Sequence, residues 1–134
     1  MTSPTEVRTA LLELHKSLVD AERLQYERTH GRLENAEFLK VLMADPQFAW
    51  LKPLTGLIVR LDEAQEDGNA EAMDSLAREL RLLLAPDDQG SVFQQRYAEV
   101  LQRSPSAVVD HGRTLRALAE WRKSGQPPAR RIGA

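Results

Sequence analysis

Two side chains able to do proton or metal chemistry, His15 and Glu22, lie seven positions apart in LHKSLVDAERLQYERTHG, residues 14–31. Seven residues turn an α-helix by about 700°, so both fall on the stripe that Leu11 and Leu18 also occupy. A carboxylate near an imidazole in an apolar wall is typical of tuned acid–base pairs, and equally of structural hydrogen-bond networks. We therefore treat this pair as the candidate site.

A buried Glu22 needs a partner, because an unpaired carboxylate inside a protein is strongly unfavourable. The sequence offers Tyr26 on the same helix, Arg60 beside the apolar face of a central helix, and His111 on the apolar face of the last helix. Our favoured hypothesis is an internal polar network that fixes the packing of the first helix, made of His15, Glu22, Tyr26 and Arg60, with His111 as a further candidate.

A metal centre is the alternative interpretation of these residues. Glu27 and His30 form an E-x-x-H, the spacing with which helices of di-iron bundles supply a carboxylate and an imidazole. Only one copy exists, because neither His15 nor His111 follows an acid by three residues. His15 and Glu22 lie about 10.5 Å apart along the helix axis, so each needs ligands from other helices. A hemerythrin-like or di-iron-like centre, holding iron, manganese or zinc, requires three or more of these five side chains to converge on one point.

Other kinds of catalytic site find little support in the sequence. The chain has no cysteine, which excludes disulfides, zinc–thiolate sites and thiol catalysis. It contains no Gly-rich phosphate loop, nucleophile elbow or pair of carboxylates at a defined spacing. We therefore expect a protein without enzymatic activity and without a cofactor.

DNA binding is a third hypothesis, because residues 97–118 have the outline of a helix-turn-helix around Ser104-Pro105-Ser106. It predicts an exposed basic face made of Arg113, Arg116, Arg122 and Lys123. Two features disfavour it: the turn lacks the usual glycine, and Asp110 falls early in the helix that would enter the groove. A serine followed by proline is also an ordinary helix cap.

Charge is distributed unevenly along the 134 residues. Residues 1–89 carry 10 basic and 17 acidic side chains, a net −7, and residues 90–134 carry 8 and 3, a net +5. The N-terminus lacks the basic and apolar regions of a secretion signal, and the most apolar run, residues 54–61, is too short for a membrane span. We expect a soluble, cytoplasmic protein with no membrane partner.

Helical periodicity throughout the chain predicts an all-α fold. We expect a single compact bundle of five or six helices over residues 1–123, with neighbouring helices mostly antiparallel. Residues 124–134 are expected to form a flexible tail. The helices are expected over about residues 4–30, 35–45, 54–67, 70–85, 89–103 and 105–123, with a short helical turn over 46–51. In the second helix, Phe38, Leu39, Leu42 and Met43 are predicted to face inward.

The segment around the central helix is apolar on more than one side. Such a helix is either wrapped by its neighbours or half of a subunit contact. Aromatic residues beside Pro53 add surface of the kind that anchors interfaces. The sequence therefore predicts a protein partner or a homo-oligomer, most simply a dimer, with interface candidates Phe48, Trp50, Leu51 and Val59.

The stretch HKSLVDAERLQYERTHGR, followed by DPQFAWLKPLTGLIVRLDE, resembles a pattern in a group of uncharacterised bacterial all-helical proteins. The resemblance covers about residues 10–67 and implies an all-helical fold without any particular activity. The matching residues are His15, Asp20, Glu22, Arg23, Tyr26, Glu27, His30, Gly31, Asp45, Pro46, Phe48, Trp50, Leu51, Pro53, Arg60, Asp62 and Glu63. The front half of the chain is therefore where we expect the functional surface.

Overall fold

The computed structural model describes the backbone of residues 3–125 and the side chains through Trp121. This part of the chain forms six α-helices and one short 3-10 helix and contains no strand, so the all-α prediction is confirmed. The elements are α1 (Pro4–His30), α2 (Asn35–Ala44), η1 (Pro46–Leu51), α3 (Lys52–Glu66), α4 (Ala70–Leu83), α5 (Val92–Arg103) and α6 (Pro105–Gly125). Of the predicted tail, residues 124–134, only 124 and 125 are described, and they continue α6 instead of starting a flexible tail; the remainder lies outside the described residues.

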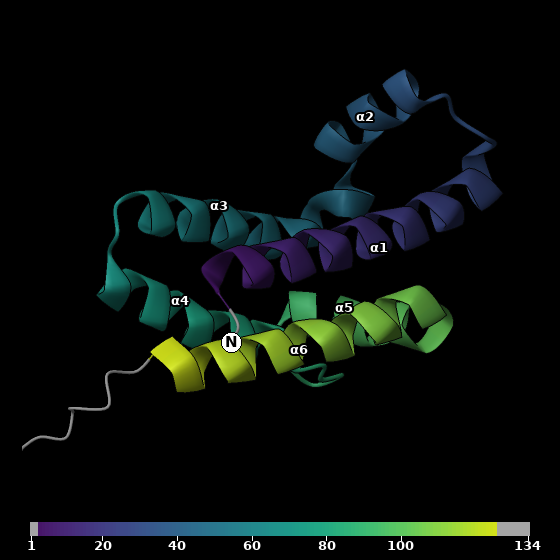
Figure 1. The fold of residues 1–134 in the computed structure, drawn as a ribbon. Helices are drawn as coiled ribbons and strands as arrows, with labels where there is room; N and C mark the ends of the chain where they lie inside the picture. Colours follow the sequence, from purple (N-terminus) through teal and green to yellow (C-terminus); the bar gives the residue numbers. More distant parts are fainter. Residues whose placement is uncertain (1–2, 126–134) are drawn as a thin grey trace, which may run out of the picture.

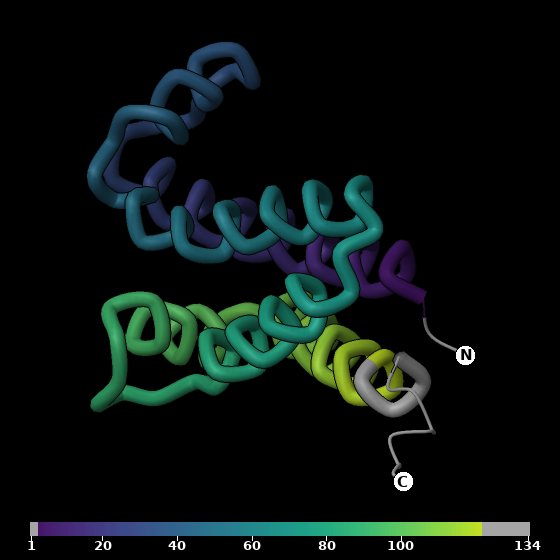
Figure 2. Tube along the Cα trace, turned by 90° about the vertical axis from the view of Figure 1, so that its left-hand side faces the viewer, coloured from purple at the N-terminus to yellow at the C-terminus, as the bar shows by residue number. Residues whose placement is uncertain are grey.

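The helices form two layers, with α1 and α3 in one layer and α4, α5 and α6 in the other (Figures 1 and 2). The long helix α1 packs mainly on α6 and also on α3, and α3 packs on α4. The apolar face of α1 that the sequence predicts is buried, including Val7, Leu11, Leu14 and Leu18. Burial of these side chains between the layers is the main stabilising contribution.

Local signals fix where the first helix begins and ends. The side chain of Ser3 accepts the backbone N–H of Glu6, and the carboxylate of Glu6 accepts the N–H of Ser3, a complete capping box. Gly31 ends α1 with φ 88° and ψ 162°. Only glycine adopts this backbone conformation readily. The chain turns there and enters α2.

Helix α2 stands apart from the two layers (Figures 1 and 2). Its main contact is with η1, and Phe38 is its only buried residue. The prediction that Leu39 and Met43 face inward is wrong, since their exposed fractions are 56% and 75%. They are exposed because α2 leans away from the bundle and no other helix of the described chain covers its far flank.

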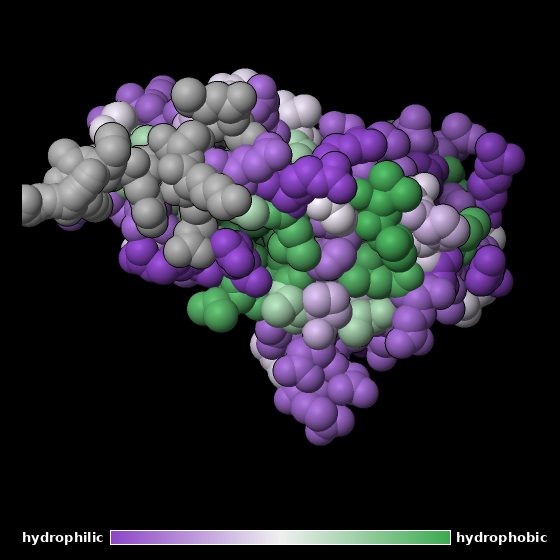
Figure 3. All heavy atoms as spheres, turned by 60° about the horizontal axis from the view of Figure 1, so that its bottom comes forward, coloured by the Kyte–Doolittle hydropathy of each residue, from purple (hydrophilic) through white to green (hydrophobic). Residues whose placement is uncertain are grey.

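The second layer also presents apolar surface. Figure 3 shows hydrophobic residues gathered in the middle of this face, surrounded by hydrophilic ones. The large exposed hydrophobic residues of α4, α5 and α6 are Leu82, Val92, Val108 and Val109. Within residues 3–125, no helix combines the length and the apolar character needed to cross a membrane.

Candidate functional site

The side chain of Glu22 lies between α1, η1 and α5, and its exposed fraction is only 4%. One carboxylate oxygen accepts the indole N–H of Trp50 at 3.3 Å, and the other accepts a guanidinium N–H of Arg103. Each oxygen therefore has a donor, and Arg103 supplies the opposite charge that a buried carboxylate requires. The partners that we predicted for Glu22 do not include these two residues.

The predicted network of His15, Glu22, Tyr26 and Arg60 is wrong, because its other members bind elsewhere. Arg60 lies on the side of α3 that faces α4, and its guanidinium pairs with the carboxylate of Glu79 at 3.2 Å. Nε2 of His15 is 3.1 Å from the hydroxyl of Thr55 on α3. Burial lowers the pKa of His15 below its ordinary value of 6.5, so the imidazole is neutral at pH 7.

His111 belongs to a separate polar pair on α5 and α6. Its Nδ1 lies 2.6 Å from the hydroxyl of Tyr97, which is fully buried. Burial raises the pKa of Tyr97, with a further increase from the nearby charge of Asp110, and burial lowers the pKa of His111. Both side chains are neutral at pH 7, and their hydrogen bond joins the two helices within the core.

The five side chains predicted as metal ligands do not converge. Among the described residues, no group of three acidic or histidine side chains could hold an ion. Instead, the carboxylate of Glu27 accepts the backbone N–H of Leu33 at 3.0 Å and Nε–H of Arg23 at 3.1 Å. The imidazole of His30 lies 3.1 Å from the carbonyl oxygen of Tyr26. Glu27 and His30 therefore have different partners despite their E-x-x-H spacing.

The second helix of the predicted helix-turn-helix lies against α1 along one face. This helix, α6, packs on α1, and its residue Thr114 is fully buried, with its hydroxyl donating to a carbonyl of α1 at 3.3 Å. The guanidinium of Arg113 lies 3.6 Å from the carboxylate of Glu13. The side chains of Arg122 and Lys123 lie outside the described residues. Arg113 thus pairs with an acid of α1 and, at 3.5 Å, with Asp110 of its own helix, and Arg116 is exposed.

The Arg23 and Glu27 pair fastens the start of α2 to the end of α1. Besides Glu27, the guanidinium of Arg23 donates to the carbonyl of Leu33 at 2.6 Å and to the side-chain oxygen of Asn35 at 3.1 Å. The hydrogen bond from Leu33 N–H, followed by that from Arg23, holds the pKa of Glu27 below its ordinary value. These bonds order the connection after Gly31, so α2 departs in a defined direction.

Aromatic contacts hold the inner side of α2 in place. The rings of Phe38 and Phe48 meet edge to face at 5.5 Å, a favourable ring geometry. The guanidinium of Arg23 lies 4.5 Å from the centre of the Phe38 ring, within the range of a cation–π contact. Tyr26 lies 6.0 Å from Phe48 and stacks on His30 at 4.1 Å. Tyr26 therefore belongs to the contacts that position α2 and not to those of the buried carboxylate.

The fixed position of α2 creates a concave surface of about 340 Å³ between α2, η1, α3 and the middle of α1, which we call the α2 groove. Its volume lies within the range of about 300–1,000 Å³ typical of ligand clefts. The floor is apolar, and Lys52 at the edge has no ion pair among the residues that the structure describes. The α2 groove is lined by His15, Leu42, Met43, Phe48, Leu51, Lys52, Thr55 and Gly56.

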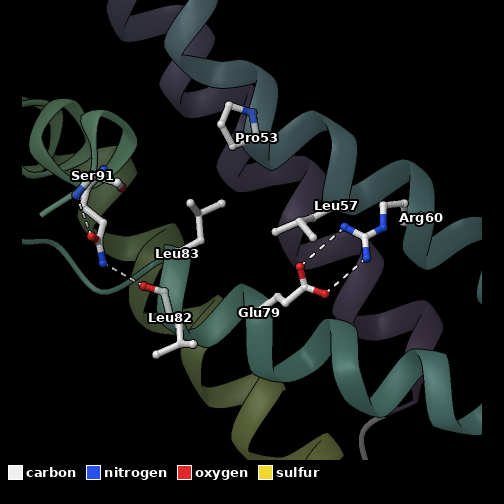
Figure 4. Close-up of a pocket in the computed structure, with 8 residues that line it drawn as sticks. Pro53, Leu57, Arg60, Glu79, Leu82, Leu83 and Ser91 are labelled. Atoms are coloured by element: carbon white, nitrogen blue, oxygen red, sulfur yellow. Dashed lines mark hydrogen bonds and ion pairs between the residues drawn. The ribbon is translucent and has the colours of Figure 1, made fainter.

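A second depression, of about 460 Å³, lies between α3, α4 and the start of α5 (Figure 4). Arg60 and Glu79 point toward each other across one end, with N–O distances of 3.2 and 3.5 Å. At the other end, Gln94 donates to the carbonyl of Leu82 at 2.9 Å and accepts from the N–H of Ser91 at 2.9 Å. The polar groups of this second depression are thus paired with one another. In the α2 groove, by contrast, the ammonium group of Lys52 has no ion pair in the described chain.

The residues predicted as a subunit interface have other roles. Phe48, Trp50 and Leu51 are buried within one chain, so the prediction that they form an exposed interface is wrong. They are buried because η1 folds back under α2 and against α5. Of the four candidates, Val59 alone is exposed. The small part of Phe48 and Leu51 that remains accessible forms the floor of the α2 groove.

The α2 groove was not predicted from the sequence, although a signal for it was present. On a helical wheel, the apolar residues of α2 span roughly 200° of its circumference. A ten-residue helix that packs mainly on one short element cannot bury so wide an apolar face. The excess apolar surface, here Leu39 and Met43, is the signal for an interaction partner.

Comparisons of the chain with models of protein families, with curated proteins and with solved structures gave no match. The resemblance of residues 10–67 to a bacterial group remains a prediction that no match tests. The geometry and chemistry of the residues themselves are therefore the basis for assigning a function.

Proposed function

We propose that the protein is a non-enzymatic interaction module that binds a helix of another protein in the α2 groove. The observation that carries the proposal is the exposure of Leu39 and Met43 beside an apolar groove that nothing in the described chain covers. Apolar patches around a concave site in a small domain mark interaction surfaces. The absence of cysteine fits a reducing cytoplasm, where we expect the protein to act.

The form of the α2 groove favours a helix as the ligand. It is lined by residues of α1, α2 and α3 with η1 at its floor, and helix-in-groove recognition inserts apolar side chains spaced three or four residues apart into such a surface. The bonds of Arg23 and Glu27 hold α2 in place before a ligand arrives. A preformed groove loses less conformational entropy on binding, which favours affinity.

The remaining polar residues support a structural role for the core. Glu22 binds Trp50 and Arg103, and Tyr97 binds His111. Each of these groups is satisfied inside the bundle, and none of these five residues lines the α2 groove. Satisfied buried networks specify one packing arrangement, which here keeps η1 and the groove in place.

Site-specific photo-crosslinking in the cells that naturally make the protein tests the proposal. A photoreactive phenylalanine analogue at Met43 should give discrete adducts with another protein on illumination. The matched control is Leu82, with an exposed fraction of 72% against 75% for Met43, because it lies in the second depression. Adducts at position 82 and none at position 43 would contradict the proposal.

A further inference from the structure

The charges around the α2 groove identify the chemistry of its ligand. We propose that the bound helix is amphipathic and acidic, with apolar residues three or four positions apart and Asp or Glu side chains beside them. This inference rests on the proposed function, and it adds the sign of the partner's charge. Its basis is two exposed lysines: Lys52, which lines the groove, and Lys40, which lies on α2 three residues before the lining residue Met43.

Neither lysine is neutralised by an ion pair in the described chain. Lys52 lines the α2 groove at the start of α3, and Lys40 lies on α2 one turn before Met43. Both side chains are exposed, and neither has an ion pair within residues 3–121. Lys16 of α1, by contrast, is paired with Asp20 at 2.9 Å. Carboxylates of a partner helix would therefore meet cations that no acidic group of the described chain neutralises.

The remaining polar groups that line the groove do not change its charge. His15 is neutral at pH 7, and its Nε2 is hydrogen-bonded to Thr55. No acidic residue is among the residues that line the groove. The partner's apolar side chains would contact Leu42, Met43 and the floor, while its acidic side chains would lie at the two lysines.

Charge also argues against a second copy of the chain as the occupant. The exposed flank of α2 is itself apolar, so a pair of α2 helices about a twofold axis is the obvious alternative. In such an antiparallel pair, the flank that carries Lys40 lies beside the same flank of the other copy, which places like charges together. Glu37, the acid of α2, lies in the first turn of the helix, where its carboxylate accepts the N–H of Glu34 at 3.0 Å.

Selection of peptides from a displayed library of helical sequences, with the wild-type protein as bait, tests the inference. The enriched peptides should carry apolar residues four positions apart and an excess of Asp and Glu. Their affinity should fall about tenfold in a K40E/K52E variant and should also weaken with added salt. A fresh selection against K40E/K52E should enrich Lys and Arg instead.

Two control variants separate charge, groove and fold. R81E/R116E makes the same change in net charge on α4 and α6, at exposed arginines without ion pairs in the described chain, and should leave peptide affinity unchanged. Gly56→Met fills the groove, because Gly56 lines it and an added Cβ meets no atom within 4 Å. This variant should fold normally and abolish binding of the selected peptides.

The possible results distinguish the partner's charge from the site itself. The inference that the bound helix is acidic would be overturned by selected peptides that show no excess of Asp and Glu, or that bind K40E/K52E as tightly as wild type. If these peptides still fail to bind Gly56→Met, the proposed function stands. Peptides that bind Gly56→Met unchanged would overturn both. Sedimentation without peptide provides a further test, since a dimer that Gly56→Met dissociates would identify a second copy as the occupant and overturn the inference.

Discussion

The carboxylate of Glu22 and the indole nitrogen of Trp50 lie 28 positions apart in the sequence and 3.3 Å apart in the structure. Arg103 binds the other carboxylate oxygen, so a single side chain joins α1, η1 and α5. The same short helix, η1, also supplies Phe48 and Leu51 to the floor of the α2 groove. The buried ion pair therefore helps to position the proposed binding surface.

Removal of Arg103 should destabilise the protein substantially. In Arg103→Ala the carboxylate of Glu22 keeps only the indole of Trp50, and the buried charge is no longer neutralised. The side chain of Arg103 is itself 34% exposed, so water can partly replace it. We therefore expect a loss of about 2–4 kcal/mol in the free energy of unfolding. Urea unfolding, followed by circular dichroism, measures this change.

The matched control for that prediction is Arg78→Ala, which removes an exposed ion pair with Asp74 on α4. An exposed pair of this kind contributes about 0.3–0.5 kcal/mol. A double variant, E22Q/R103Q, should recover part of the lost stability, because no unpaired charge stays buried. Equal and small effects of Arg103→Ala and Arg78→Ala would show that the buried ion pair does not matter.

Stability should fall as the pH drops below about 6.5. Burial lowers the pKa of both His15 and His111 from the ordinary value of 6.5, so the unfolded chain binds more protons than the folded chain just below that pH. The stability that comes from keeping these two histidines neutral is fully present above the histidine pKa of the unfolded chain. It is lost progressively as the pH falls toward the lower pKa values of the folded chain. Unfolding measured in urea at a series of pH values between about 7 and 5 should show this slope.

The histidine variant H15Q/H111Q checks the cause of that slope. Its stability should be nearly independent of pH over the same interval, whatever its absolute value. The control is His30→Gln, because His30 is exposed at the end of α1. An unchanged slope in H15Q/H111Q would mean that other groups produce the pH dependence.

Gly31 should be needed for the position of α2. At its φ of 88° and ψ of 162°, an alanine is strained. Gly31→Ala should therefore lower stability by about 1–3 kcal/mol and weaken peptide binding. Gly112→Ala is the matched control, because Gly112 lies inside α6 with no atom within 4 Å of an added Cβ. That substitution should raise stability by about 0.5–1 kcal/mol, as measured by thermal unfolding.

The two sides of α2 should respond differently to substitution. Met43→Glu alters an exposed side chain, so the free energy of unfolding should change by about 0.5 kcal/mol or less. The same substitution should abolish peptide binding. Phe38→Ala removes the buried contact of α2 with Phe48 and should cost about 3 kcal/mol. A large loss of stability in Met43→Glu would assign Met43 to the fold instead of to binding.

The sequence predicted the helices well because their signals are local. Gly31, Asp45-Pro46 and Ser104-Pro105 each mark a boundary that the structure places within one or two residues. The 3.6-residue period also predicted the buried face of α1, including the unusual burial of Glu22. Such features depend on neighbours within a few positions along the chain.

The partners of the buried groups could not be predicted in this way. Arg103 lies 81 positions after Glu22, and periodicity does not say which end of α5 meets α1. Trp50 could have been inferred, because a buried indole is a donor only and needs an acceptor. Arg60 has the right charge for Glu22, but it lies on the face of α3 that meets α4. Long-range pairing depends on helix order and tilt, which local patterns do not encode.

The most direct test of binding in the α2 groove is NMR of protein labelled with ¹³C at the methionine methyl groups. The chain has 3 methionines, so the signals of Met43 in the groove and Met73 on α4 are readily assigned. Addition of a selected acidic helical peptide should shift the Met43 signal until saturation and leave the Met73 signal unchanged. A bound peptide that leaves the Met43 signal in place would contradict the proposed function.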